Sequence, residues 1–130
     1  MDELRRDIKR QLLEHLGKTV CPLCGEREAI PMHEIVYVPV SGGKYGAKTG
    51  ALAEALFVKE LCVLLCAECN ERIGGGKAYQ TQLLAYNIVQ FGVEAVVEAL
   101  SNVAKLVKVP AVWMPLSIEH NGQVYQVETE

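Results

Sequence analysis

Apolar residues recur at every fourth position near the start of the chain, at Leu4, Ile8, Leu12 and Leu16. Residues four apart share one face of a helix, so the pattern predicts an amphipathic helix over residues 1–17, ended by Gly17. The positions between them carry the basic residues Arg5, Arg6, Lys9 and Arg10. This basic face is either solvated or in contact with a phosphate backbone.

Strand and helix patterns then alternate along the chain. Residues 29–40 are rich in β-branched and aromatic residues, which favours a strand or hairpin, and the apolar run "LCVLLC" reads as a second strand. The stretch "ALAEALFVKE" between them predicts a short helix. Two longer helical patterns follow "GGGK" and are separated by Gly92. The tail alternates polar and apolar residues around Asn121–Gly122, a strong signal for a two-residue hairpin turn.

These elements predict the α+β class. With 130 residues, the chain has the length of one domain with one core. Its expected parts are an N-terminal helix (1–17), a central unit (21–77), a helical pair (78–109) and a hairpin (111–128).

Charge and hydropathy restrict the function classes. The net charge is −3, which argues against a strongly basic nucleic-acid binder, but residues 1–77 balance 11 basic against 11 acidic residues. The acidity lies in residues 78–130, with 2 basic and 5 acidic residues. No apolar run approaches the roughly 20 residues of a membrane span, and the charged N-terminus is unlike a signal peptide. We therefore expect a cytoplasmic location, in the host cell if the chain is phage-encoded.

Four of the five cysteines form two CxxC pairs, Cys21–Cys24 and Cys66–Cys69. In a chain that is not secreted, this pattern favours a metal over disulfides. Four thiolates complete a closed tetrahedral site, which predicts structural zinc, with an iron centre as the alternative. The fifth cysteine, Cys62, lies among apolar residues and is expected to be a small buried hydrophobe.

The two pairs are separated by 41 residues, whereas simple zinc ribbons use about 15–20. The insertion contains "MHEI" and a Gly-Gly loop, and "CVLLCAECN" closes the unit. With these motifs, residues 21–77 resemble the HNH endonuclease family of the His-Me finger (ββα-metal) class, in its zinc-stabilised form. "CxxCN" followed by glycines is also similar to the phage Holliday-junction resolving endonucleases of that class. The resemblance implies a zinc-bound ββα-metal core, and the flanking helices and the C-terminal hairpin lie outside it.

The resemblance also implies roles for individual residues. His33 falls at a metal-binding position of the family, and Asn70 matches its final metal ligand. Glu34 stands where the family has its general-base histidine, and Leu61 stands where it has an asparagine. A register shifted by one makes His33 the base and puts Met32, a weak thioether ligand, at the metal. The resemblance leaves Glu34 as the base or as a third ligand of the catalytic cation.

The implied function is hydrolysis of DNA phosphodiester bonds by a metal-dependent hydrolase, with Mg²⁺ or Mn²⁺ as the catalytic cation. Four side chains are weaker candidates for phosphate contacts: Lys44, Lys48, Arg72 and Lys77. A homodimer would let a nicking unit cut both strands. The alternative is a non-catalytic zinc module, derived from an HNH scaffold, that binds nucleic acid or protein.

Overall fold

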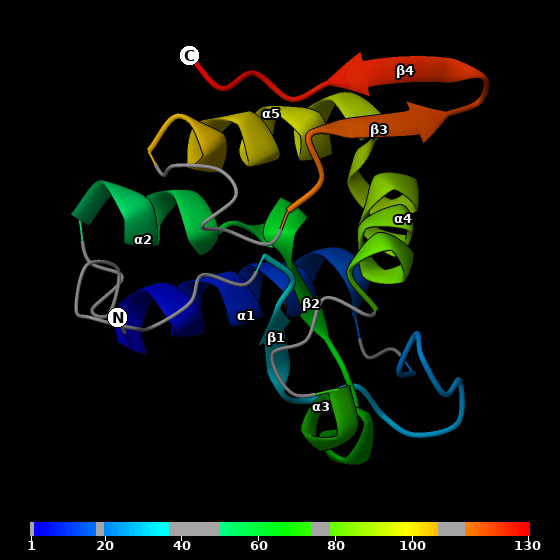
Figure 1. Ribbon diagram of the computed structural model, residues 1–130. Helices are drawn as coiled ribbons and strands as arrows, with labels where there is room; N and C mark the ends of the chain where they lie inside the picture. The colour runs from blue at the N-terminus through cyan, green and yellow to red at the C-terminus, as the bar shows by residue number, and fades with distance from the viewer. Residues whose placement is uncertain (1, 18–19, 37–49, 74–78, 107–113) are drawn as a thin grey trace.

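The chain forms several helices and two small antiparallel sheets, of which the C-terminal one lies at the outer edge of the molecule in Figure 1. The structure is a computed structural model and describes residues 2–17, 20–36, 50–73, 79–106 and 114–130. The helices are α1 (Asp2–Leu16), α2 (Gly50–Leu56), the 3₁₀ helix η1 (Lys59–Leu61), α3 (Ala67–Ile73), α4 (Gln80–Phe91) and α5 (Val93–Ala104). The strands are β1 (Met32–Glu34), β2 (Cys62–Leu64), β3 (Ser117–His120) and β4 (Gln123–Gln126). The predicted α+β class is therefore confirmed.

The central sheet pairs β1 with β2 in antiparallel register, with His33 opposite Val63. Backbone bonds extend the pairing beyond both strands: Ile30 donates to Leu65 over 2.9 Å and Ile35 donates to Leu61 over 3.0 Å. Successive residues of a strand point to opposite faces, so the two faces of this pair contact different parts of the molecule.

One face of the β1–β2 pair packs against α1. The cluster there contains Ile8 and Leu12 of α1 together with Met32, Cys62 and Leu64 of the strands. The four-residue spacing of the N-terminal helix thus directs its apolar stripe at the sheet, as the sequence predicts. Cys62 is fully buried in this cluster, which confirms that it serves as a small core residue.

We expect Leu12→Ala to lower the free energy of unfolding by about 2–5 kcal/mol, because Leu12 is only 1% exposed and its loss leaves a cavity under α1. Leu13→Ala is the matched control, since the neighbouring leucine is 40% exposed and should cost far less. Denaturant unfolding of both variants measures the difference. Equal losses would contradict the docking of α1 through Leu12.

The other face of the β1–β2 pair belongs to the larger core cluster. Val63 lies there with Leu83 and Ile88 of α4 and Leu100 of α5. Asn87 is a polar residue inside this layer, 1% exposed, and its Nδ2 donates to the carbonyl oxygens of Glu60 and Cys62, each over 2.9 Å. The Asn87 side chain therefore fixes the backbone at the point where η1 passes into β2.

The C-terminal hairpin forms where the sequence predicts it. β3 and β4 pair with His120 opposite Gln123, and Asn121 and Gly122 take positive φ angles of 52° and 81°. Positive φ at both turn residues is the requirement of a type I′ turn, and Asn-Gly meets it at little steric cost. Behind the hairpin, the backbone N–H of Glu128 donates to Ser101 Oγ over 2.9 Å, which attaches the chain end to α5.

Several expectations fall partly outside the described residues. The strand pattern over 29–40 gives a three-residue strand, and residues 37–49 are not described. The helix expected for "ALAEALFVKE" is shorter than its pattern, because η1 replaces its last turn. The division into one domain with four parts stays a prediction. Within the described ranges, every helix is too short or too polar to cross a bilayer.

Candidate functional site

The four paired cysteines converge on one point. The Sγ atoms of Cys21, Cys24, Cys66 and Cys69 all lie within 4.8 Å of one another, and those of Cys24 and Cys66 are 3.8 Å apart. A tetrahedral zinc site with Zn–S bonds of about 2.3 Å separates its sulfurs by about 3.8 Å. The four side chains can therefore hold one metal ion, and their spacing is consistent with structural zinc.

The first pair sits in a tight turn before β1. The N–H of Cys21 donates to the carbonyl of Arg27 over 2.7 Å, and the N–H of Gly25 donates to Cys21 over 2.8 Å. Gly25 takes a φ of +69°, which glycine adopts without strain. This turn folds the chain back so that Cys21 and Cys24 face the same point.

The second pair lies where β2 leads into α3. Cys66 precedes the helix and Cys69 lies in its first turn, so the N–H of Cys69 donates to Cys66 Sγ over 3.3 Å. Cys66 and Cys69 are buried, whereas Cys24 is half-buried. The thiolate pair is therefore positioned by the end of a buried strand and the start of a helix.

The electrostatics of the cluster suit a cation. Backbone hydrogen bonds from Glu26 and Arg27 lower the pKa of Cys24 to about 6. The hydrogen bond with the Cys66 side chain raises the pKa of Cys69 to about 12. Four crowded sulfurs cannot all carry negative charge unless a cation offsets their repulsion, so the donor set fits a divalent metal.

A second set of candidate residues meets beside the cysteine cluster. His33 lies at the centre of β1, and Asn70 follows Cys69 in α3; both side chains are half-buried. Burial lowers the pKa of His33, while the charge of Glu34 and a side-chain hydrogen bond with Asn70 raise it. The tertiary structure thus brings together the two residues to which the resemblance assigns a cation.

Glu34 lies on the opposite face of the β1–β2 pair. Its register partner is Cys62, which is buried under α1, whereas His33 pairs with Val63 on the α3 side. The Glu34 carboxylate forms an ion pair with Arg5 of α1 over 3.3 Å. Because successive residues of a strand point to opposite faces, the side chains of His33 and Glu34 lie on different faces of the β1–β2 pair. The role of Glu34 as base or third ligand stays a prediction.

Leu61, at which the resemblance implies an asparagine, is 1% exposed, so its side chain is part of the core. An amide is nevertheless present at this turn, because Asn87 of α4 bonds the backbone on both sides of Leu61. The sequence analysis did not select Asn87, although the sequence indicates it: Asn87 stands four residues after Leu83 and therefore lies within the apolar stripe of α4. A polar residue at a core position requires a hydrogen-bond partner.

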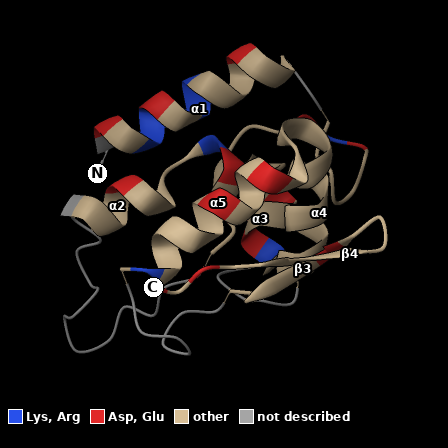
Figure 2. Cartoon of the chain, turned by 90° about the horizontal axis from the view of Figure 1, so that it is seen from above, with Lys and Arg blue, Asp and Glu red and all other residues tan. Residues whose placement is uncertain are grey.

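Of the four candidate phosphate contacts, only Arg72 lies within the described residues. Lys44, Lys48 and Lys77 lie outside the described residues. Arg72 is exposed on α3 and pairs with Glu68, which also forms an ion pair with Arg27. Figure 2 shows both charge signs along α1, whereas the only charged residues within α5 are acidic. The role of these cations stays a prediction.

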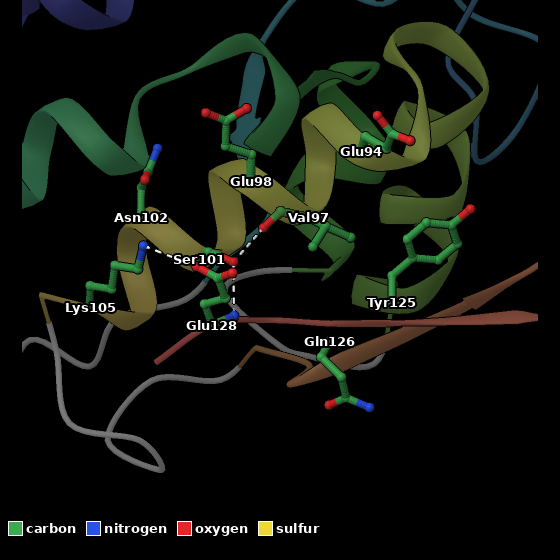
Figure 3. Close-up of a pocket in the computed structure, with 9 residues that line it drawn as sticks. All are labelled: Glu94, Val97, Glu98, Ser101, Asn102, Lys105, Tyr125, Gln126 and Glu128. Atoms are coloured by element: carbon green, nitrogen blue, oxygen red, sulfur yellow. Dashed lines mark hydrogen bonds and ion pairs between the residues drawn. The ribbon is translucent and has the colours of Figure 1, made fainter. Parts of the chain in front are cut away.

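One hollow of about 210 Å³ is lined in part by Cys24 and Cys69 of the cluster, whereas others lie away from it. A cavity of about 340 Å³ lies between α5 and β4, and Figure 3 shows the side chains that line it. Within it, Lys105 pairs with Glu128 over 3.3 Å and Ser101 Oγ donates to the carbonyl of Val97 over 2.9 Å. The ion pair attaches the C-terminal segment to Lys105 at the end of α5, whereas the Ser101 bond lies within the helix, so both contacts have a structural role.

The candidate site therefore has two parts. The four cysteines can hold one metal ion, and the side chains of His33 and Asn70 lie close to each other on β1 and α3. Comparisons with family models, with curated proteins and with solved structures find no match for this chain.

Proposed function

We propose that the chain is an HNH-like, metal-dependent endonuclease that hydrolyses DNA phosphodiester bonds. The observation that carries this proposal is the meeting of His33 and Asn70 beside the four-cysteine cluster. The antiparallel pair of β1 and β2, which α2 and η1 separate in the chain, is followed by α3 with the second CxxC pair at its start, and this arrangement supports a ββα-metal core. This arrangement and this pair of side chains are two features that the resemblance implies, whereas Glu34 and Leu61 depart from its general-base histidine and its asparagine.

The two parts of the site have different tasks in this proposal. The four cysteines hold zinc, which stabilises the fold around β1, β2 and α3. His33 and Asn70 bind the catalytic cation, for which the resemblance indicates Mg²⁺ or Mn²⁺. When bound, that cation stabilises the leaving oxygen and the charge on the phosphorus centre. Burial keeps His33 neutral near pH 7, so its nitrogen lone pair is available to a metal or a proton.

The test is cleavage of supercoiled plasmid by the zinc-loaded protein with Mg²⁺, Mn²⁺ or Ni²⁺. We expect nicking that falls at least about 100-fold in His33→Ala and in Asn70→Ala, because positioned acid–base and metal groups contribute about 10²–10⁴ in rate. His120→Ala is the matched control, since this histidine lies beside the exposed hairpin turn. Zinc content and circular dichroism establish that each variant is folded.

The double variant His33→Ala with Glu34→Ala gives the decisive comparison. If the wild-type protein cuts no better than this variant with any of the three metals, the endonuclease proposal is wrong. Arg5→Ala separates the role of Glu34 from that of His33, because it removes the ion pair between Arg5 and Glu34 and leaves His33 unchanged.

One observation favours the second candidate, a non-catalytic zinc module that binds nucleic acid or protein. Glu34 and Leu61, the two departures from the family motif, are engaged in the ion pair with Arg5 and in the core. A module of this kind binds without cutting. Binding of a labelled DNA duplex that is unchanged in His33→Ala, with no cleavage, would select it over the nuclease.

A further inference from the structure

The four sulfurs of the cysteine cluster differ in their access to solvent. Cys21, Cys66 and Cys69 are at most 3% exposed. Cys24 is half-buried, and the chain turns back on itself directly after it, at Gly25 with a φ of +69°. A small reagent in solution therefore meets the cluster first at Cys24.

The hollow of about 210 Å³ beside the cluster lies next to this sulfur. Its walls combine Cys24 and Cys69 with Ile73 of α3 and with Tyr79 and Gln82 at the start of α4. This volume is ample for a molecule as small as hydrogen peroxide, since a single bound water requires only about 10–15 Å³. The hollow therefore gives a small oxidant a place beside the most accessible thiolate of the cluster.

A second sulfur lies within reach of Cys24. Cys66 Sγ is 3.8 Å from Cys24 Sγ, and the backbone N–H of Cys69 donates to Cys66 Sγ over 3.3 Å, which holds this sulfur in place. A disulfide bond is about 2.05 Å long, so the two sulfurs need to approach each other by roughly 2 Å. Residues 25–28, which follow Cys24, are exposed, so the turn on this side has room to move.

We propose that Cys24 is an oxidation site, at which hydrogen peroxide in the adjoining hollow converts Cys24 and Cys66 to a disulfide and releases the zinc. The Cys24 thiolate attacks one peroxide oxygen, so that an S–O bond forms, the O–O bond breaks and hydroxide leaves. The Cys66 thiolate then attacks the Cys24 sulfur, so that an S–S bond forms, the S–O bond breaks and a second hydroxide leaves. Two electrons pass in total from the two thiolates to the peroxide.

The disulfide removes two of the four thiolate ligands. Structural zinc sites are four-coordinate, so the two remaining thiolates hold the ion poorly. Because structural zinc contributes directly to folding, its release loosens the unit formed by β1, β2 and α3. A thiol reductant together with zinc restores the original cluster. The inference rests on the four-cysteine cluster and not on nuclease activity, so it is tested without DNA.

The experiment exposes zinc-loaded protein to a small excess of hydrogen peroxide and follows the released zinc with a chromogenic chelator. Dimedone traps sulfenic acids, N-ethylmaleimide blocks the remaining thiols, and mass spectrometry maps both at successive times. We expect the first sulfenic acid at Cys24, the first disulfide between Cys24 and Cys66, and zinc release in step with that disulfide. Cys62 serves as the internal control and should stay reduced, because it is 0% exposed under α1.

The order of these events decides the result. A first disulfide within either CxxC pair would overturn the inference, and so would zinc release that precedes any oxidation of Cys24. Addition of dithiothreitol and zinc should restore the metal content and the circular dichroism spectrum. Failure to recover either of them would show damage to the chain in place of a reversible disulfide.

Two tryptophan variants test the route through the hollow. Gln82→Trp places a bulky ring at the wall of the hollow, whereas Thr81→Trp is the matched control at the neighbouring exposed position, which lines a different hollow between α4 and β3. We expect Gln82→Trp to slow zinc release by at least about threefold and Thr81→Trp to leave it unchanged, because thiol oxidation follows exposure. Zinc content and circular dichroism before oxidation establish that both variants are folded. Equal rates in the wild-type protein and in folded Gln82→Trp would overturn the inference.

Discussion

Replacing Cys24 with serine is expected to release the metal and to unfold the central unit around β1, β2 and α3. The free energy of structural zinc binding in small domains is about 10–16 kcal/mol, which is as large as the whole stability of a typical domain. Cys24 is only half-buried, so serine disturbs packing little and the loss reports on the metal. Zinc content per chain and thermal unfolding by circular dichroism measure the effect, and a chelator added to wild-type protein should reproduce it.

Cys62 supplies the control for this prediction. Cys62→Ala also removes a buried sulfur, but Cys62 lies under α1 and outside the four-cysteine cluster. This variant should retain one metal ion per chain and lose only about 1–2 kcal/mol of stability. A Cys24→Ser protein with full zinc content and unchanged unfolding would contradict the structural metal site.

Asn87→Asp is expected to destabilise the fold by about 3 kcal/mol or more near neutral pH. The change replaces the Nδ2 donor by a carboxylate oxygen facing the carbonyl oxygens of Glu60 and Cys62, at a site that is 1% exposed. Burying an unpaired charge against two acceptors costs more than losing the hydrogen bonds alone. Denaturant unfolding of the zinc-loaded variant measures the loss, and Asn87→Ala should show a smaller one of about 1–3 kcal/mol.

The pH dependence of this variant has a defined sign. Burial beside carbonyl oxygens raises the pKa of the new carboxyl in the folded chain above its unfolded value of about 3.9. The variant therefore loses stability relative to wild type as pH rises through the folded pKa, so its deficit should be larger at about pH 8 than at about pH 5.5. Asn102→Asp on the exposed surface of α5 should show neither effect. A deficit independent of pH would show that the carboxylate escapes to solvent.

The secondary structure followed closely from local sequence where one pattern dominated. The four-residue spacing of Leu4, Ile8, Leu12 and Leu16 was sufficient for α1, and Asn121–Gly122 was sufficient for the hairpin, because both signals act within a few residues. The short helix α3 had no comparable periodicity, since most of its seven residues are polar or ligating. Only the resemblance anticipated a helix there.

The candidate site was likewise predictable from the sequence only where it depends on residues close together in the chain. The two CxxC pairs fixed the identity of the four thiol ligands, because each pair can bend back on one ion and the number of thiols completes a tetrahedron. The position of His33 between the pairs indicated where to search, but neighbouring positions in the sequence could not show that His33 and Glu34 point apart. That separation depends on the register of β1 against β2, which long-range pairing determines.

The sequence by itself determined the ligand chemistry of the cysteine cluster, the helical spacing of α1 and the turn of the C-terminal hairpin, because each depends on residue type at short separation. Only the tertiary structure decided that Asn70 meets His33, that Arg5 engages Glu34 and that Asn87 supplies an amide at the turn before β2. Each of these contacts joins residues from different elements. Packing across the β1–β2 pair selects the partners, and the spacing of residues along the chain does not predict them.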